Sequence, residues 1–186
     1  MPFKIKILMM LKNEDDLLLK WGIFHGNMVG YENLIIFDNG SSSNITLDAL
    51  HVLERDGAIV VRDKNSRDDF YNKGTVISNY IKECDANDPA DFYFPLDCDE
   101  FLGTSVADES VASFEIEEIS NSLSIHLNSS DILMIGGEYG NFPGHPDMFR
   151  FSPTQRKCFF AKGACDTLNR GYHQAKVTLP LLANPD

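Results

Sequence analysis

The amino-acid sequence predicts an α/β fold, with a mostly parallel central sheet flanked by helices in a single domain. Two observations predict it. From residue 3 to residue 102, short apolar runs alternate with segments of helical spacing, which is typical of strands joined by crossover helices. Three of the apolar runs end in short polar segments, and ligands of parallel sheets bind beyond the carboxyl ends of the strands. The polar segments therefore predict where a site lies.

The elements of the first half follow from this alternation. The predicted strands cover residues 3–11, 33–37, 58–62 and 92–96, and the predicted helices cover residues 14–27, 44–55 and 70–84. Asn13 can cap the first helix, and Gly57 stands just past the end of the second. Pro95 lacks an N–H for a strand ladder, so we expect it at the last turn of its strand or at a bulge.

The second half carries weaker patterns. The spacing predicts an amphipathic helix over residues 114–127 and strands over residues 131–136 and 156–162. Residues 136–144 are rich in glycine and predict a loop. Their spacing differs from that of a phosphate-binding loop, so we do not predict one there.

Asp97 and Asp99 carry the strongest chemical pattern. They follow the apolar run at residues 92–96, and side chains two apart on an extended chain point the same way. Two carboxylates aimed at one point favour a cation between them, and hard oxygen ligands suit Mg²⁺ or Mn²⁺. An acidic surface turn is the alternative. The apolar residues Phe101 and Leu102 disfavour it, because they place core on both sides of the motif.

Composition limits the partners. The chain has 186 residues, 43% of them hydrophobic, and a net charge of −12 without a basic stripe, which argues against nucleic acid as a partner. Its four cysteines lack the C-x-x-C spacing, which favours reduced thiols and a cytoplasmic location. We expect no membrane span, because no stretch is apolar over sufficient length.

Residues 11–25, 36–41 and 96–102 together resemble the family 2-like glycosyltransferases of the GT-A fold, which bind nucleotide diphospho-sugars. The resemblance is to the subgroup with a K-N-E start and a D-x-D-E-F motif, here Lys12-Asn13-Glu14 and Asp97 to Phe101. It implies a nucleotide-sugar donor such as a UDP-sugar, a glycan or other hydroxyl acceptor, a divalent metal (Mn²⁺ or Mg²⁺), and a sheet of mixed direction after the acidic motif. Residues 1–102 would then form a nucleotide-binding half and residues 103–186 an acceptor-side half. Relatives continue beyond the histidine near the end of this chain, so the second half is expected to be truncated or short.

The same resemblance implies roles for single residues. The implied nucleotide-binding residues are Asn13, Glu14, Asp38, Lys73, Asp97 and Cys98, with Lys73 near the pyrophosphate. The implied metal ligands are Asp97, Asp99 and His173, and Lys157 matches a lysine in the strand before that histidine.

The catalytic base must come from beyond the acidic motif, because the earlier strand ends are assigned to nucleotide and metal. Glu138 is the predicted base, since it follows an apolar strand and enters the glycine-rich loop; Asp147 and Asp166 compete with it. The family implies inversion at the anomeric carbon. The loop departs from the family pattern, because Gly136 stands where a tryptophan is expected. Two alternatives stay open: a nucleotidyltransferase, and a nucleotide- or glycan-binding module without turnover.

Overall fold

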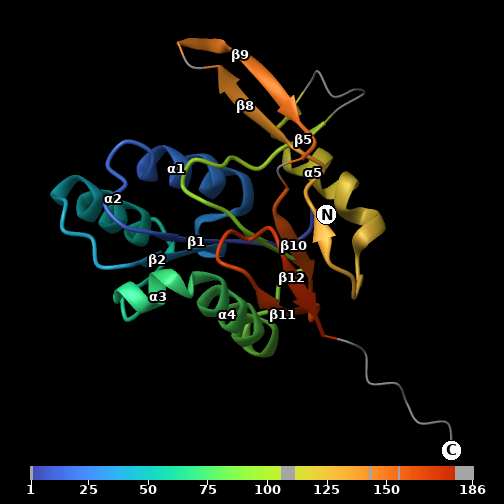
Figure 1. Cartoon of the computed structure of the whole chain (residues 1–186), viewed down its shortest axis with the longest axis horizontal. Coiled ribbons are helices and arrows are strands. Elements are labelled where there is room, and N and C mark those ends of the chain that lie inside the picture. Colours follow the sequence, from blue (N-terminus) through green and yellow to red (C-terminus); the bar gives the residue numbers. More distant parts are fainter. Residues whose placement is uncertain (1, 106–111, 143, 155, 179–186) are drawn as a thin grey trace, which may run out of the picture.

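The computed structural model describes residues 2–105, 112–142, 144–154 and 156–178. Its centre is a six-stranded sheet with the order β3-β2-β1-β4-β10-β7 (Figure 1). β1, β2, β3 and β4 pair in parallel, and β10 pairs antiparallel with both β4 and β7. The predicted α/β class with a mostly parallel sheet is confirmed, and so is the change of direction after the acidic motif.

The strands of this sheet are β1 (Ile5–Leu11), β2 (Leu34–Asp38), β3 (Ile59–Val61), β4 (Phe92–Pro95), β7 (Leu133–Met134) and β10 (Cys158–Ala161). The helices are α1 (Leu18–Val29), α2 (Asn44–Arg55), α3 (Arg67–Tyr71), α4 (Lys73–Asn87), α5 (Ile116–Leu123) and two short 3-10 turns, η1 (Tyr31–Asn33) and η2 (Ser124–His126). The remaining strands of the described residues form three two-stranded sheets: β5 (Thr104–Ser105) with β6 (Ala112–Ser113), β8 (Glu138–Phe142) with β9 (His145–Ser152), and β11 (Cys165–Leu168) with β12 (Ala175–Val177). Among the helices described, none combines the length and the apolar character needed to cross a membrane.

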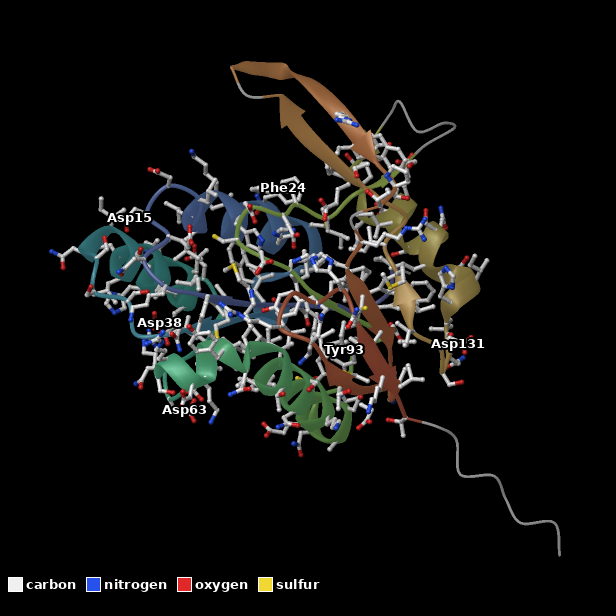
Figure 2. The ribbon with its side chains drawn as sticks, viewed as in Figure 1. Asp15, Phe24, Asp38, Asp63, Tyr93 and Asp131 are labelled. Atoms are coloured by element: carbon white, nitrogen blue, oxygen red, sulfur yellow. The ribbon has the colours of Figure 1, made fainter. Side chains whose placement is uncertain are left out.

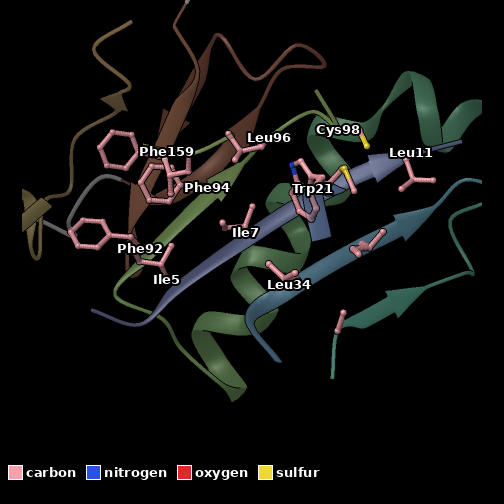
Figure 3. Packing of buried hydrophobic residues seen from close by; sticks show 14 of the residues in the cluster. Ile5, Ile7, Leu11, Trp21, Leu34, Phe92, Phe94, Leu96, Cys98 and Phe159 are labelled. Carbon is pink, nitrogen blue, oxygen red and sulfur yellow. The ribbon is translucent and has the colours of Figure 1, made fainter. Parts of the chain in front are cut away.

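Alternate residues of β1 supply two core layers, one on each face of the sheet. All seven residues of β1 are buried. Ile5, Ile7 and Met9 belong to the layer that α1 and α2 cover, and Phe159 of β10 joins the same layer (Figure 3). Leu8 and Met10 belong to the opposite layer, which α4 covers. The period of two along an extended chain explains this division. Because both faces are covered, β1 is apolar at every position except Lys6.

Two helix starts differ from the prediction. α1 begins at Leu18 rather than Glu14 and has no side-chain cap, so Asn13 is not its N-cap. Asn13 instead adopts a left-handed backbone with φ 56°, and its side chain holds a neighbouring loop. The predicted helix over residues 70–84 is two helices, because Ser66 and Asp69 form a capping box that starts α3 earlier. The bounds predicted for α2 are confirmed.

The second half departs further from expectation. The predicted helix over residues 114–127 is α5 followed by η2, and the strand expected over residues 131–136 shortens to β7. The glycine-rich segment is not a loop, because most of it forms the hairpin of β8 and β9, which projects from the body of the protein (Figure 1). Gly137 lies at the base of this hairpin, where a Cβ would come within 2.6 Å of the Phe151 ring.

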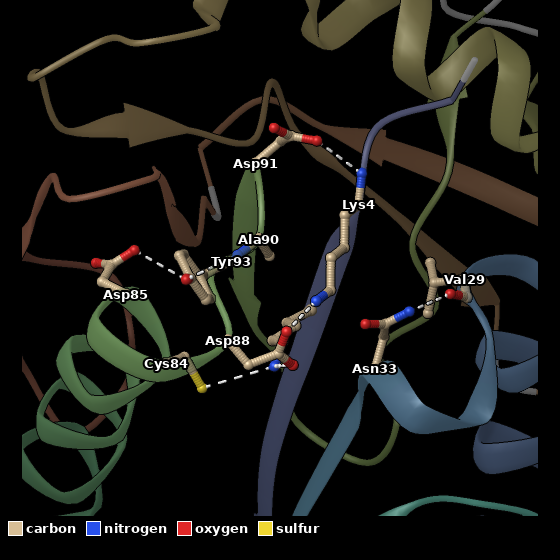
Figure 4. Close-up of polar contacts among 10 residues, drawn as sticks. Lys4, Val29, Asn33, Cys84, Asp85, Asp88, Ala90, Asp91 and Tyr93 are labelled. Atoms are coloured by element: carbon tan, nitrogen blue, oxygen red, sulfur yellow. Dashed lines mark hydrogen bonds and ion pairs between the residues drawn. The ribbon is translucent and has the colours of Figure 1, made fainter.

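Polar contacts fasten the amino-terminal end of the sheet, opposite the predicted site. Lys6 is 1% exposed, and its ammonium lies 2.6 Å from Asp88, which also pairs with Lys4 (Figure 4). The Tyr93 hydroxyl donates to Asp85 at 2.8 Å. Buried polar groups are stable when they are paired, so these contacts hold the end of α4 against β1 and β4.

Pro95 is the last residue of β4, which confirms one of the two positions expected for it. It faces Leu8 of β1, and Leu96 continues the backbone bonding by donating to Leu8 at 3.0 Å. The chain therefore leaves the sheet directly into Asp97.

Candidate active site

A cavity of about 670 Å³ opens at the carboxyl ends of β1, β2 and β4, where the sequence predicts the site. Its lining comes from β1, from the segments after these strands, and from α3 and α4. The lining residues are Met10, Leu11, Lys12, Glu14, Leu17, Asn39, Arg67, Phe70, Lys73, Asp97, Cys98 and Asp99. Five of the residues predicted from the sequence are therefore brought together, namely Glu14, Lys73, Asp97, Cys98 and Asp99.

Asp97 is the centre of an ion cluster. Lys73, at the start of α4, places its ammonium 2.6 Å from Oδ1, and Lys157, just before β10, places its ammonium 2.5 Å from Oδ2. Lys157 also lies 3.1 Å from Glu100, whose other carboxylate oxygen accepts from the Asp97 backbone N–H at 2.7 Å. Two carboxylates and two ammonium groups thus balance each other beside the cavity.

The environment favours the charged forms of Asp97 and Lys157. Burial acts to raise the pKa of Asp97, but hydrogen bonds from Lys157 and Lys73 outweigh burial and hold that pKa below its usual value. Burial acts to lower the pKa of Lys157, but the interactions with Asp97 and Glu100 together outweigh burial and raise the pKa. Burial raises the pKa of Glu100. The site therefore holds two fixed positive charges whose main anionic partner is Asp97.

Asp99 differs from Asp97 because it is exposed and has no hydrogen bond or ion pair with the residues described. Mg²⁺ and Mn²⁺ are often held by one or two carboxylates together with the phosphates of a ligand. Asp99 fits that role. Asp97 fits it less well, since both its oxygens already accept from ammonium groups. Within the described residues, no group of three or more His, Cys, Asp or Glu side chains is close enough to form a metal centre by itself.

His173 does not line the cavity, although it contacts the residue that precedes Lys157 of the ion cluster. Its Nδ1 lies 2.7 Å from the Arg156 carbonyl, and its side chain is exposed. This contact ties the histidine to the residue before Lys157. Its role as a metal ligand stays a prediction.

Asn13 and Asp38 connect the loops that follow β1 and β2. Asn13 Oδ1 accepts from the backbone N–H groups of Ser42 and Ser43 at 2.8 and 3.0 Å. Asp38 is buried, and its Oδ1 accepts from the Ser41 N–H at 2.8 Å, at the sheet end labelled in Figure 2. Neither residue lines the cavity. Both hold the loops that follow β1 and β2, and their contacts with a nucleotide stay predictions.

Cys98 lines the cavity, yet it is buried. Burial raises the pKa of its thiol to about 12, so the thiol stays protonated and is not a nucleophile near neutral pH.

Glu138, the predicted base, begins β8 at the base of the projecting hairpin and is not among the residues that line the cavity. Asp166 lies in β11, where it pairs with Lys82 at 3.1 Å. The side chain of Asp147 lies outside the described part of the structure. The identity of the base therefore stays a prediction.

Asn39, Arg67 and Phe70 line the cavity without a role assigned from the sequence, although Asn39 lies in one of the polar segments that predict the site. Asn39 follows Asp38 at the end of β2, and its amide donates to the carbonyls of Lys64 and Ser66 at 2.7 and 2.8 Å. Arg67 and Phe70 come from α3, which the periodicity merged with the next helix. The Ser66–Asp69 spacing is the signal that could have placed the start of α3.

Comparison with known proteins identifies the class of the fold. No protein-family model matches the chain. A search of curated proteins finds no match either. Among solved structures, the chain is similar to TarS of S. aureus, a glycosyltransferase, with a TM-score of 0.52 and 14% sequence identity. The match covers 77% of this chain and 23% of the TarS chain. At this identity the likeness shows a glycosyltransferase-like fold and nothing finer.

Proposed function

We propose that this chain is a metal-dependent glycosyltransferase domain of the GT-A type, which moves a sugar from a nucleotide-sugar donor, a UDP-sugar by preference, to a hydroxyl acceptor. The observation that carries the proposal is the cavity at the ends of β1, β2 and β4, which is lined by Lys73, Asp97 and the exposed Asp99. Lys157 adds a second ammonium group next to this lining, through its ion pair with Asp97. A nucleoside diphosphate needs positive charge along its phosphates, and Lys73 and Lys157 supply it.

The residues divide the work as follows. Lys73 and Lys157 bind the diphosphate, and Asp99 binds the metal. The metal, when bound, neutralises charge on the leaving diphosphate. Glu138 is proposed as the group that removes the proton from the acceptor hydroxyl, with inversion at the anomeric carbon. The four cysteines are free and buried, which supports the reducing, cytoplasmic setting expected for such a domain.

Calorimetry with UDP tests the proposal. We expect UDP to bind the parent protein in Mn²⁺ and to bind more weakly in EDTA. Asp99→Asn removes one ligand charge, so it should lower affinity in Mn²⁺ by about tenfold or more, an effect of the size measured for charge-assisted contacts. Asp131→Asn, an exposed aspartate outside the cavity, is the matched control and should bind as the parent does. Absence of UDP binding to the parent protein would reject the proposal.

A binding module without turnover is the second candidate. The observation that favours it is the position of Glu138, which is outside the cavity lining. Release of UDP from UDP-sugars, measured with and without Mn²⁺, separates the two candidates, because a module binds UDP without releasing it from a donor. A nucleotidyltransferase would instead form pyrophosphate from a nucleoside triphosphate.

A further inference from the structure

We infer that Tyr172 is a positioning residue for the diphosphate: its ring holds the ammonium groups of Lys73 and Lys157 beside the cavity. The inference rests on the proposed function for the identity of the ligand. Tyr172 is fully buried, and it does not line the cavity. Its effect on a ligand must therefore act through the two lysines.

The aromatic ring lies next to both positive charges. The Lys73 ammonium is 4.5 Å and the Lys157 ammonium 4.9 Å from the centre of the Tyr172 ring. Both distances fall within the range at which a cation is attracted to an aromatic face. The two lysines come from different elements, 84 positions apart, and like charges repel. Among the described residues, the Tyr172 ring and Asp97 each contact both ammonium groups and so keep the two charges together.

Backbone contacts fix the ring in this place. The Tyr172 carbonyl accepts from the Cys158 N–H at 2.7 Å, directly after Lys157, and the Tyr172 N–H donates to the Asn169 carbonyl at 3.1 Å. Tyr172 has a left-handed backbone with φ 62°, which is uncommon for a residue with a side chain. Strained positions of this kind persist where the surrounding structure imposes them.

The start of α4 packs against the same loop from the other side. A Cβ at Gly74 would lie 2.3 Å from the carbonyl oxygens of Leu168 and Asn169, so the helix approaches the loop as closely as a glycine permits. Lys73, the neighbour of this glycine, is thereby placed over the ring. Arg170 of the same loop lies over the rings of Phe70 and Tyr71, at 5.2 and 4.7 Å, which fastens the loop to α3 as well.

The hydroxyl of Tyr172 is not what holds the lysines. It is buried and has no hydrogen-bond partner among the described residues. The ring therefore carries the function, and an aromatic side chain without the hydroxyl should replace tyrosine.

The arrangement has a consequence for binding. Without a ligand, Asp97 accepts from both ammonium groups. A diphosphate carries more negative charge than one carboxylate and competes for the same two donors. When it draws them away from Asp97, the ring still limits how far they move, so the charges stay paired for the incoming phosphates.

Calorimetry on two variants tests the inference, with UDP and uridine as probes in EDTA. Tyr172→Leu removes the aromatic face and should weaken UDP by about tenfold, the size of a desolvated cation–π contact. Affinity for uridine, which lacks phosphates, should not change. Tyr172→Phe should restore UDP affinity to within about twofold of the parent value, because the ring remains. A purely structural role would change the melting temperature and leave the ratio of UDP to uridine affinity unaltered.

A second measurement needs neither a ligand nor the leucine variant. The NMR signals of the Lys73 and Lys157 ε-methylene protons should be shifted upfield by the ring in the parent protein and in Tyr172→Phe. Ordinary lysine shifts would overturn the inference, even if UDP binds. Upfield shifts without any UDP binding would instead reject the proposed function and leave the ring–lysine arrangement standing. Equal UDP affinity in Tyr172→Leu and the parent would overturn the positioning role.

Discussion

His25 joins α1 to the segment that follows the acidic motif. Its ring is buried, Nδ1 lies 3.0 Å from the Trp21 carbonyl, and Nε2 accepts from the Leu102 N–H at 3.1 Å. The ring is therefore neutral, with its proton on Nδ1. Phe101 stacks on it with ring centres 5.7 Å apart. His25 thus anchors the end of the loop that contains Asp97 and Asp99.

This histidine predicts acid sensitivity. Burial lowers the pKa of His25 from 6.5 to about 4. The unfolded chain gains a proton near pH 6.5 that the folded protein does not accept, so stability present above that pH is lost as the pH falls towards 4. The loss is about 3 kcal/mol over this range, from about 1.4 kcal/mol for each pH unit. Urea unfolding at pH 7.5, 6, 5 and 4 measures it.

His25→Leu is the control for this effect. The variant leaves the Leu102 N–H without its acceptor, which should cost about 1–3 kcal/mol at pH 7.5. The part of the pH dependence that belongs to His25 should then disappear. If parent and variant lose stability equally between pH 6.5 and 4, another group is responsible.

Glu138→Gln tests the proposed base. Loss of a positioned base usually costs about 10²–10⁴ in rate, so turnover should fall by that factor while UDP affinity is unchanged. Glu117→Gln, on the exposed face of α5, is the matched control. Near-normal turnover in Glu138→Gln would move the assignment to Asp147 or Asp166. NMR of the product tests stereochemistry, and a retained anomeric configuration would contradict inversion.

At the residue scale, the sequence predicts which charged side chains gather at the ends of the strands. It does not predict which carboxylate pairs with which lysine. Asp97 and Asp99 were treated as equivalent, because strand geometry points them the same way. The structure separates them, since Asp97 is engaged by two lysines and Asp99 is exposed. Lys157 and Tyr172 reach the site through long-range contacts with Asp97 and Lys73, and the local period of a strand or helix contains no such information.

At the scale of elements, α4 and the loop between β11 and β12 decide the shape of the ion cluster. A Cβ at Gly74 would lie 2.3 Å from backbone carbonyl oxygens, and backbone cannot move aside as a flexible side chain can. Gly74→Ala should destabilise the protein by about 1–3 kcal/mol, because overpacking outweighs the better helix propensity of alanine. Urea unfolding measures this change.

Gly136→Ala is the matched control for Gly74→Ala. Among the described residues, apart from its two chain neighbours, no atom lies within 4 Å of a Cβ at Gly136, and its backbone is not left-handed. Stability should therefore change by less than about 0.5 kcal/mol. A Gly74→Ala protein as stable as the parent would mean that the loop yields easily. In that case Tyr172 would not be held firmly over the lysines.

The elements that the sequence predicted well are those with both a clear period and a defined end. α2 was found with its limits, since its apolar face is periodic and Gly57 follows with φ 120°. The sequence predicts a loop where the hairpin of β8 and β9 forms, because the glycines interrupt the alternation of apolar and polar side chains that is typical of a strand. The split between α3 and α4 was missed, since the periodicity continues across Asn72 while the capping box fixes only the first of the two helices.

At the scale of the whole molecule, the predicted nucleotide-binding half and acceptor-side half share one sheet. β10 pairs with β4, and Phe159 stacks on Phe94 with ring centres 4.7 Å apart (Figure 3). Lys157 crosses from the second half to Asp97 in the first. The division of the sequence after residue 102 therefore does not divide the hydrophobic core, which contains residues from both halves.

This shared core predicts that residues 2–102 do not fold alone. Truncation there removes seven large buried side chains from the two core layers: Ile119, Leu123, Leu133, Phe159, Phe160, Leu168 and Tyr172. At about 1.5–3 kcal/mol for each, the loss is about 10 kcal/mol or more. A whole domain is stable by only about 5–15 kcal/mol. The open edge of β4 would in addition favour aggregation.

Urea unfolding and amide NMR of two chains, residues 2–102 and residues 2–178, measure the effect. We expect the longer chain to unfold in one cooperative transition and the shorter one to give poorly dispersed amide signals without a transition. The longer chain keeps β10 and the loop that carries Tyr172. It is therefore the control that should fold under the same conditions. A cooperative transition in the shorter chain would mean that β1, β2, β3 and β4 with their helices form an independent unit. The ion cluster would then be assembled by docking of two parts, and UDP binding would depend on the concentration of the second part when the two are supplied as separate chains.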